Sequence, residues 1–244
     1  MKTRYEHEDY IDYYGGDPGK IAKASAILQI TQQAGNAQMS AEKPTYDDLM
    51  AEGKAFMLSR LDLEVYETLY SDENYIVSSW PCESQRATFF RNYSVEKDGK
   101  RMALISSYWV LVELETRRLL KVDDLDMSNY YIGPFEELHK DKFKIPRDME
   151  LQEVGKKEIC YCDLDGNGHM NNTYYLDVLS NYIPELPEGT HRIKSVRLHY
   201  SKEAPFGDVI TIFRGQDEEG AYYFKTVKES GEMNIACKIE ITEL

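Results

Sequence analysis

An internal repeat is the feature of this sequence that most limits how the chain can fold. Residues 87–114, ATFFRNYSVEKDGKRMALISSYWVLVEL, are echoed by residues 221–244, AYYFKTVKESGEMNIACKIEITEL. Each copy opens with an aromatic pair, passes a glycine turn (Asp98-Gly99 or Ser230-Gly231) and returns as an alternating strand. That pattern is typical of an antiparallel hairpin. The repeat therefore predicts two similar structural units.

The segments before these hairpins also match each other. Residues 58–77 align with residues 193–212, where Val196, Leu198 and Tyr200 alternate with polar residues. Alternation with a period of two indicates a half-buried strand.

A helix is expected before the strands of each half. In the first half, Asp17 is a candidate N-cap for a helix that runs to about Met39. In the second half, Asn171 or Asn172 is the candidate cap, and Pro184 ends the helix.

Each half thus reads as a strand, a helix and several antiparallel strands, which predicts an α+β fold with one helix covering each sheet. The first half adds residues 45–53, expected to form a short helix capped by Thr45. We place the first unit at 1–135, a solvated linker at 136–154 and the second unit at 155–244. The two sheets are expected to lie side by side.

The composition narrows the function classes. The chain is 42% hydrophobic and 30% charged, as expected for a globular protein. Its formal net charge of −14 argues against nucleic acid as a partner, because phosphate neutralisation needs a basic face. No apolar run is long enough to span a membrane, and the N-terminus lacks an apolar signal region, so the cytoplasm is the expected location. The four cysteines are expected to be buried structural thiols: Cys82, Cys160, Cys162 and Cys237.

The two halves differ in the turn before the predicted helix. Aligning residues 10–20 with residues 161–171 sets three polar residues, Asp165, Asn167 and His169, against Tyr14, Gly16 and Pro18. The second copy then holds a carboxylate, an amide and an imidazole, and the first copy holds none of them. This asymmetry predicts that chemistry takes place in the second half.

The start of this turn resembles a calcium-binding loop, with Asp163, Asp165 and Asn167 at alternate positions. Such a loop needs a bidentate glutamate at its twelfth position, where this chain has Tyr174. The preceding segment is also strand-like rather than helical. We therefore predict no metal here, and Asp163 is interpreted as a turn residue.

Three motifs carry a family resemblance. Residues 163–185, DLDGNGHMNNTYYLDVLSNYIPE, resemble the signature of the plant and bacterial acyl-acyl carrier protein thioesterases. LHYSKEA (198–204) is similar to a second motif of this family, and SSYWVLVELETRRLLKV (106–122) is similar to a third. The resemblance implies a tandem hotdog fold, in which each half is a long helix packed in an antiparallel sheet. It also implies that most of the acyl pocket lies in the first half and that catalysis takes place in the second.

Carried over by motif, the implied catalytic residues are Asp165, Asn167, His169 and Glu203. The family often has cysteine where this chain has Ala204, so a cysteine nucleophile at that position is excluded. The nucleophile is then either water activated by a carboxylate or a carboxylate itself.

Within this set, Glu203 is the first choice for the base and Asp165 the alternative. His169 is expected to orient the water or to protonate the leaving thiolate, and Asn167 to position the substrate. The start of the following helix is a candidate oxyanion site. No cofactor is predicted.

The implied reaction is hydrolysis of fatty acyl-acyl carrier protein. Alternatives are an acyl-coenzyme A thioesterase, a hydroxyacyl thioester dehydratase and a non-catalytic acyl-binding protein. An acidic carrier protein would need a local basic patch to dock on this acidic chain. The candidate cations are Lys140, Lys142, Lys144, Arg147, Lys156, Lys157, Arg192 and Lys194. A homodimer through an exposed sheet edge is also possible.

Overall fold

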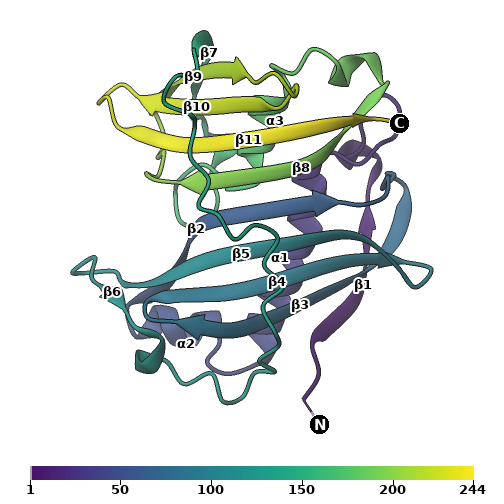
Figure 1. The fold of residues 1–244 in the computed structure, drawn as a ribbon. Coiled ribbons are helices and arrows are strands. Elements are labelled where there is room, and N and C mark those ends of the chain that lie inside the picture. The colour runs from purple at the N-terminus through teal and green to yellow at the C-terminus, as the bar shows by residue number, and fades with distance from the viewer. Residues whose placement is uncertain (1) are drawn as a thin grey trace.

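The computed structural model describes residues 2–244, in which the strands form one large antiparallel sheet with helices on one of its faces (Figure 1). The helices are α1 (Ala24–Ala41), α2 (Tyr46–Ala51) and α3 (Tyr174–Ser180). Four short 3₁₀ helices are η1 (Tyr13–Gly15), η2 (Val122–Asp124), η3 (Tyr161–Asp163) and η4 (Leu186–Glu188). The strands of the first half are β1 (Tyr5–Ile11), β2 (Lys54–Val65), β3 (Glu73–Gln85), β4 (Thr88–Lys97), β5 (Lys100–Glu113) and β6 (Leu119–Leu120). Those of the second half are β7 (Gln152–Glu158), β8 (His191–Tyr200), β9 (Val209–Gln216), β10 (Tyr222–Lys228) and β11 (Met233–Glu243).

The two halves join edge to edge in the middle of the sheet. The strand order is β1-β3-β4-β5-β2-β8-β11-β10-β9-β7, with β6 paired to β5. Strands β2 and β8 pair antiparallel across the junction, with Asp62 opposite Arg197 at the centre of the register. The predicted side-by-side arrangement and both predicted hairpins, β4–β5 and β10–β11, are confirmed.

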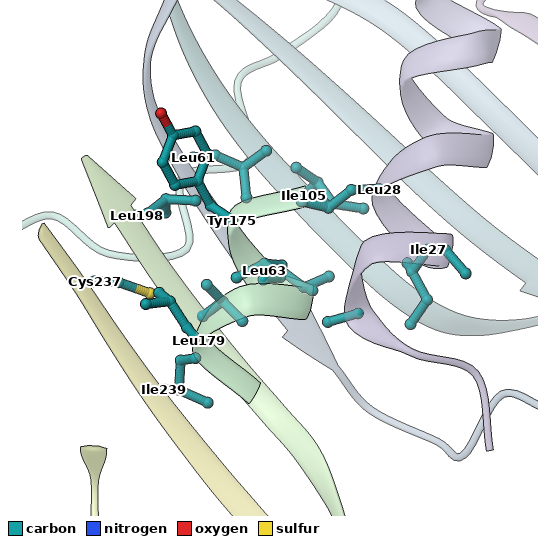
Figure 2. Close-up of a cluster of buried hydrophobic side chains, with 14 of the residues drawn as sticks. Ile27, Leu28, Leu61, Leu63, Ile105, Tyr175, Leu179, Leu198, Cys237 and Ile239 are labelled. Carbon is teal, nitrogen blue, oxygen red and sulfur yellow. The ribbon is translucent and has the colours of Figure 1, made fainter. Parts of the chain in front are cut away.

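A single apolar core runs between the sheet and the helices. Figure 2 shows Ile27 and Leu28 of α1 in the same cluster as Leu63 of β2, Leu179 of α3 and Leu198 of β8. These five side chains are at most 2% exposed. Burial of apolar area shared by both halves stabilises them as one body. The predicted α+β arrangement is therefore confirmed.

The helix boundaries differ from the prediction. Helix α1 begins at Ala24 after Lys23, so Asp17 is not its N-cap. The Asp17 carboxylate instead accepts hydrogen bonds from the backbone N–H of Gly19 (2.8 Å) and Ile21 (2.9 Å), which closes a separate turn. The short helix α2 forms as predicted, and Thr45 caps it in a reciprocal capping box with Asp48.

Helix α3 is much shorter than the helix expected for the second half. It spans seven residues, and its N-cap position is Thr173 rather than either asparagine. The Asn171 side chain accepts from the Thr173 N–H at 2.9 Å and thereby forms the turn that precedes the helix. The expectation of a long helix in each half is thus wrong for the second.

The connection between the halves crosses the sheet face opposite α1 (Figure 1). The linker expected at 136–154 is mostly exposed, but it is held against the sheet, where the Asn92 amide donates to the Glu136 carbonyl at 2.9 Å. Phe143 is 5% exposed, the Phe135 ring stacks on Phe90 at 4.6 Å, and the Trp80 indole donates to the Pro134 carbonyl at 3.2 Å. These contacts form a second, smaller apolar layer on the outer face of the sheet.

All four cysteines are free thiols. Cys82 and Cys237 are buried as predicted, but Cys160 and Cys162 are exposed. Strand β7 ends at Glu158, so these two residues lie beside and within η3 and not on one strand face. Within residues 2–244, no helix has both the length and the apolar character that a membrane crossing requires.

Candidate active site

The candidate catalytic turn follows β7 and η3 and is held by backbone hydrogen bonds. The Asp165 N–H donates to the His169 carbonyl at 2.9 Å, and Gly168 has a φ of +82°, which favours glycine. His169 and Pro205 form an antiparallel bridge, and the Met170 N–H donates to the Ala204 carbonyl at 2.9 Å. These contacts attach the turn to the segment that carries Glu203.

As a result, the His169 imidazole lies between two carboxylates. Its Nδ1 is 3.6 Å from Asp165 Oδ1, and its Nε2 is 3.7 Å from Glu203 Oε1. The side chains of His169 and Asp165 are each 20% exposed, and that of Glu203 is 36% exposed. Both separations exceed a direct hydrogen bond, as is common in ligand-free active sites. A water or substrate atom can therefore bridge the imidazole and Glu203.

Asp165 and Asn167 are both engaged in the turn. Asp165 Oδ1, the oxygen nearest His169, accepts from the Asn167 backbone N–H at 2.8 Å. The Asn167 side-chain oxygen accepts from the Tyr46 hydroxyl at 3.4 Å. Tyr46 begins α2, in the other half of the chain. Sequence reasoning missed this contact because no local pattern relates residues so far apart.

Asp163 is a turn residue, as predicted. Its Oδ2 accepts from the Cys160 N–H at 2.7 Å and from the Lys157 ammonium at 2.5 Å. The segment before it is strand β7, which agrees with the strand-like flank expected from the sequence. Among residues 2–244, no three His, Cys, Asp or Glu side chains cluster as metal ligands would.

The turn opens onto a cavity of about 1180 Å³ that extends into the first half. All four predicted site residues line it, together with apolar side chains from α1, α2 and the first-half strands. The latter include Met39, Leu49, Phe56, Leu58, Phe89 and Trp109. Pockets for small molecules usually span roughly 300–1,000 Å³, so this one has room for a long apolar chain.

Several backbone N–H groups at the start of α3, where the oxyanion site is expected, already donate hydrogen bonds. The Thr173 and Tyr174 N–H groups donate to the Asn171 side chain (2.9 Å) and carbonyl (3.1 Å). The Leu176 N–H donates to the Thr173 carbonyl at 3.2 Å. These three donors are therefore engaged, and the oxyanion site at the helix start stays a prediction.

A buried network supports the segment just before Glu203. The Asn234 amide is fully buried and donates to the Tyr175 hydroxyl (3.0 Å) and the Lys202 carbonyl (2.5 Å). Its oxygen accepts from the Thr226 hydroxyl at 2.8 Å. Burial raises the pKa of Tyr175 to about 12, so this phenol stays neutral and acts as a fixed wall of the cavity.

The equivalent turn of the first half corrects our alignment of the repeats. There the Asp17 N–H donates to the Ile21 carbonyl at 2.9 Å, as Asp165 does to His169. The Asp17 carboxylate accepts from the Gly19 N–H, as Asp165 does from Asn167. Asp17, and not Tyr14, is therefore the counterpart of Asp165. The first half keeps the carboxylate but has Gly19 and Ile21 in place of the amide and the imidazole.

The predicted docking cations do not surround the cavity. Lys140, Lys142, Lys144 and Arg147 are exposed, but they lie on the connection that crosses the face opposite α1 (Figure 1). Lys157 pairs with Asp163, and Arg192 donates to the Val65 carbonyl at 3.1 Å. Three cations that we did not predict line the cavity instead: Arg91, Arg117 and Lys202.

Comparison with known proteins agrees with the resemblance read from the motifs. Residues 2–131 match the family model of the acyl-ACP thioesterase N-terminal domain, and residues 148–243 match that of the C-terminal domain. Oleoyl-acyl carrier protein thioesterase 1 of Arabidopsis thaliana is 27% identical over 169 residues, which cover 64% of this chain and 46% of that protein. Palmitoyl-acyl carrier protein thioesterase of Cuphea hookeriana is 26% identical over 156 residues, 60% of this chain and 37% of that protein. The chain thus spans about half the length of the curated relatives it matches.

Solved structures share the fold over nearly the whole chain. An acyl-ACP thioesterase from Bacteroides thetaiotaomicron has a TM-score of 0.87 at 22% identity, covering 97% of both chains. The 12:0-ACP thioesterase from Umbellularia californica has a TM-score of 0.83 at 18% identity, covering 99% of this chain and 98% of that one. The expected tandem hotdog fold is confirmed. The chain, matched in both of its halves by the family's domain models, belongs to the acyl-ACP thioesterase family.

Proposed function

We propose that this protein hydrolyses the thioester of fatty acyl-acyl carrier protein and releases free fatty acid during fatty acid biosynthesis. One observation carries the proposal: an imidazole between two carboxylates lies at the wall of a cavity of about 1180 Å³. Family membership and the substrates named for the relatives support it.

In the proposed reaction, Glu203 acts as the general base. A water bridging Glu203 Oε1 and His169 Nε2, which are 3.7 Å apart, gives its proton to the carboxylate as its oxygen attacks the thioester carbonyl carbon. The tetrahedral intermediate then expels the thiolate, and the carbon–sulfur bond breaks. Glu203 passes the proton that it took from the water to His169 Nε2, and the imidazole delivers it from Nε2 to the departing sulfur. Direct attack by the Glu203 carboxylate through an anhydride is the alternative for the first step.

Asp165 and Asn167 have positioning roles in this proposal. The Asp165 carboxylate holds the turn through the Asn167 N–H and faces His169 Nδ1, which favours the tautomer with its proton on Nδ1. The Asn167 side-chain oxygen accepts from the Tyr46 hydroxyl, which leaves the NH₂ group of this cavity-lining amide to donate to the substrate.

Steady-state kinetics on one acyl chain presented on carrier protein and on coenzyme A tests the assignment. Glu203→Gln and His169→Ala are each expected to lower kcat by about 10²-fold or more, as for loss of a general base or acid. Asp165→Asn, which keeps the turn's acceptor oxygen, should retain more activity than Asp165→Ala. Glu229→Gln, an exposed change in the β10–β11 turn, is the matched control. Wild-type kcat in Glu203→Gln, His169→Ala and Asp165→Ala alike would refute the assignment.

The same assay separates the alternatives. A higher kcat/KM on the coenzyme A thioester would favour an acyl-coenzyme A thioesterase, and water loss from a hydroxyacyl thioester would favour a dehydratase. Chain binding without release of free acid would indicate a non-catalytic binder. The retained imidazole and carboxylates at the cavity argue against the last of these.

Other features of the proposal follow from the substrate. The carrier protein with its phosphopantetheine-linked chain is the proposed partner, and Arg117 and Lys202 are the cations best placed to meet it. The first unit, 1–135, would supply most of the acyl pocket, and the second, 155–244, the reacting groups. A cytoplasmic location and a homodimer through edge strand β1 or β7 complete the proposal.

A further inference from the structure

A buried arginine lines the cavity, and no charged partner for it lies within residues 2–244. Arg91 on β4 is 8% exposed. Its Nη1 donates to the Gln38 side-chain oxygen and to the Ser79 hydroxyl, both at 2.6 Å. Both acceptors are uncharged and fully buried. A guanidinium keeps its charge under all ordinary conditions, so the wall of this apolar cavity carries a permanent cation.

Within residues 2–244, no carboxylate lies within ion-pair distance of Arg91, and its Nε and Nη2 donate no hydrogen bond. The nearest link to a carboxylate runs through Gln38, whose amide is 3.4 Å from both Glu42 oxygens. In contrast, Arg101 on the outer face pairs with Glu136 at 2.6 Å. An arginine serving packing alone is expected to have such a partner, because an uncompensated buried charge is costly.

A second donor on the same cavity also lacks an acceptor. Gln32 of α1 lines the cavity, and its side-chain Nε2 is buried without a hydrogen-bond partner. A saturated hydrocarbon chain can satisfy neither this amide nor the free edge of Arg91. Buried donors such as the Gln32 amide are normally paired, and the free edge of Arg91 lines the same cavity, so the two together point to an oxygen acceptor on the ligand.

The position of Arg91 fixes which part of the ligand it meets. Glu203 follows β8 and His169 is bridged to the segment after it, and the sheet order from β8 runs β8, β2, β5, β4. Three steps of about 4.8 Å place β4 roughly 14 Å from β8. Arg91 therefore faces the distal part of an acyl chain, away from its thioester.

We propose that Arg91, assisted by Gln32, selects acyl chains that carry an oxygen acceptor, a hydroxyl or a carboxylate, on their distal part. The free Nε–Nη2 edge of the guanidinium matches a carboxylate in two parallel hydrogen bonds, which makes a carboxylate the stronger form of the ligand. This inference rests on the proposed thioesterase function for its kinetic test, but its binding test does not.

The experiment compares three acyl-carrier protein substrates of equal length, ending in a methyl, a hydroxyl or a carboxylate group. The wild-type protein is expected to prefer an oxygen-bearing chain over the methyl-ended chain. Arg91→Met should lower the ratio of kcat/KM on the oxygen-bearing chain to kcat/KM on the methyl-ended chain by roughly 10- to 100-fold. This is the loss expected when a hydrogen bond to a charged group is removed. A larger effect on the carboxylate than on the hydroxyl would identify the anion as the ligand. Arg214→Met, a change to an arginine that donates to the Tyr182 carbonyl and does not line the cavity, is the matched control.

Calorimetric binding of the corresponding free acids gives a readout that needs no hydrolysis. A preference for the oxygen-bearing acid that is lost in Arg91→Met would support the inference even if no thioester is cleaved, in which case only the proposed function fails. A wild-type protein that cleaves or binds the methyl-ended chain at least tenfold better would overturn the inference and leave the thioesterase function intact. This wild-type comparison decides the matter even if Arg91→Met does not fold.

Discussion

Two ionisable groups at the β2–β8 junction, one fully and one partly buried, are expected to impose opposite pH dependences on stability. Asp62 is fully buried, and its carboxylate oxygens are 3.5 Å from Arg197 Nε and 3.9 Å from Arg60 Nε. Burial raises the pKa of Asp62 from 3.8 to about 6, although both arginines act to lower it and Asp141 adds to the rise. Burial, together with Arg60, Arg197 and Lys142, lowers the pKa of His199 from 6.5 to about 4.

The direction of each pH dependence follows from whether the folded or the unfolded protein holds the proton more tightly. Between pH 3.8 and about 6, the folded protein keeps the Asp62 proton that the unfolded chain has lost, so stability falls as the pH rises. Between pH 6.5 and about 4, the unfolded chain protonates His199 before the folded protein does, so stability falls as the pH drops. The shift for Asp62 corresponds to about 3 kcal/mol. For His199, which is only partly buried, about 2 kcal/mol remains after solvent screening.

Chemical denaturation at pH values between 4 and 6.5 makes the two effects separable. Relative to the wild-type protein, Asp62→Asn should gain about 3 kcal/mol in the free energy of unfolding as the pH rises across this range. His199→Gln should lose about 2 kcal/mol over the same range, because the wild-type penalty at low pH disappears. For Glu229→Gln, the exposed control, the difference in unfolding free energy from the wild-type protein should not change with pH. Difference curves of the same sign for both junction variants would refute the reasoning.

Two further predictions concern the first-half elements around the cavity. Thr45→Ala removes the capping box with Asp48, and about 1 kcal/mol of stability should be lost in thermal unfolding; an unchanged Tm would show that α2 needs no cap. Gly35→Ala places a Cβ 2.9 Å from the Tyr93 hydroxyl, whose ring is 3% exposed, so α1 must shift from the sheet. We expect a loss of about 1–3 kcal/mol from crowding in chemical denaturation, despite the better helix propensity of alanine, and a gain would contradict the close packing of α1.

The parts of the fold that were predictable are those determined by local chemistry. The β4–β5 hairpin was predicted from Asp98-Gly99, and these residues adopt φ values of 52° and 74°. The cap at Thr45 was predicted in the same way. A two-residue turn or a capping box depends on neighbours in sequence, so its signal lies within a few residues.

The features that were missed depend on tertiary contacts. The Tyr46–Asn167 contact joins the two halves, and the charge-free surroundings of Arg91 depend on β3 and α1. The sequence also placed Asp17 at a helix start because an aspartate before a proline commonly caps a helix. Only the backbone hydrogen bonds reveal that it forms a turn of its own.

The two equivalent turns indicate which of the two carboxylates near His169 has the chemical role. Asp17 and Asp165 each accept a hydrogen bond from the backbone two residues on, at 2.8 Å, although the first turn has no imidazole. A carboxylate present in both turns is explained by the backbone it holds. Asp165 therefore supports the turn and, through it, the position of His169.

Glu203 has no such explanation. The Ala22 N–H donates to the Leu69 carbonyl at 2.9 Å, as the Met170 N–H does to Ala204, so the first-half counterpart of Glu203 is Thr68. The backbone is thus formed equally well without a carboxylate at this position. At the position of His169, the first half has Ile21, which is 6% exposed and closes its turn with apolar packing. Within residues 2–244, the imidazole and Glu203 lie together where the cavity opens, which supports the proposal that they carry the proton transfers while Asp165 holds the turn.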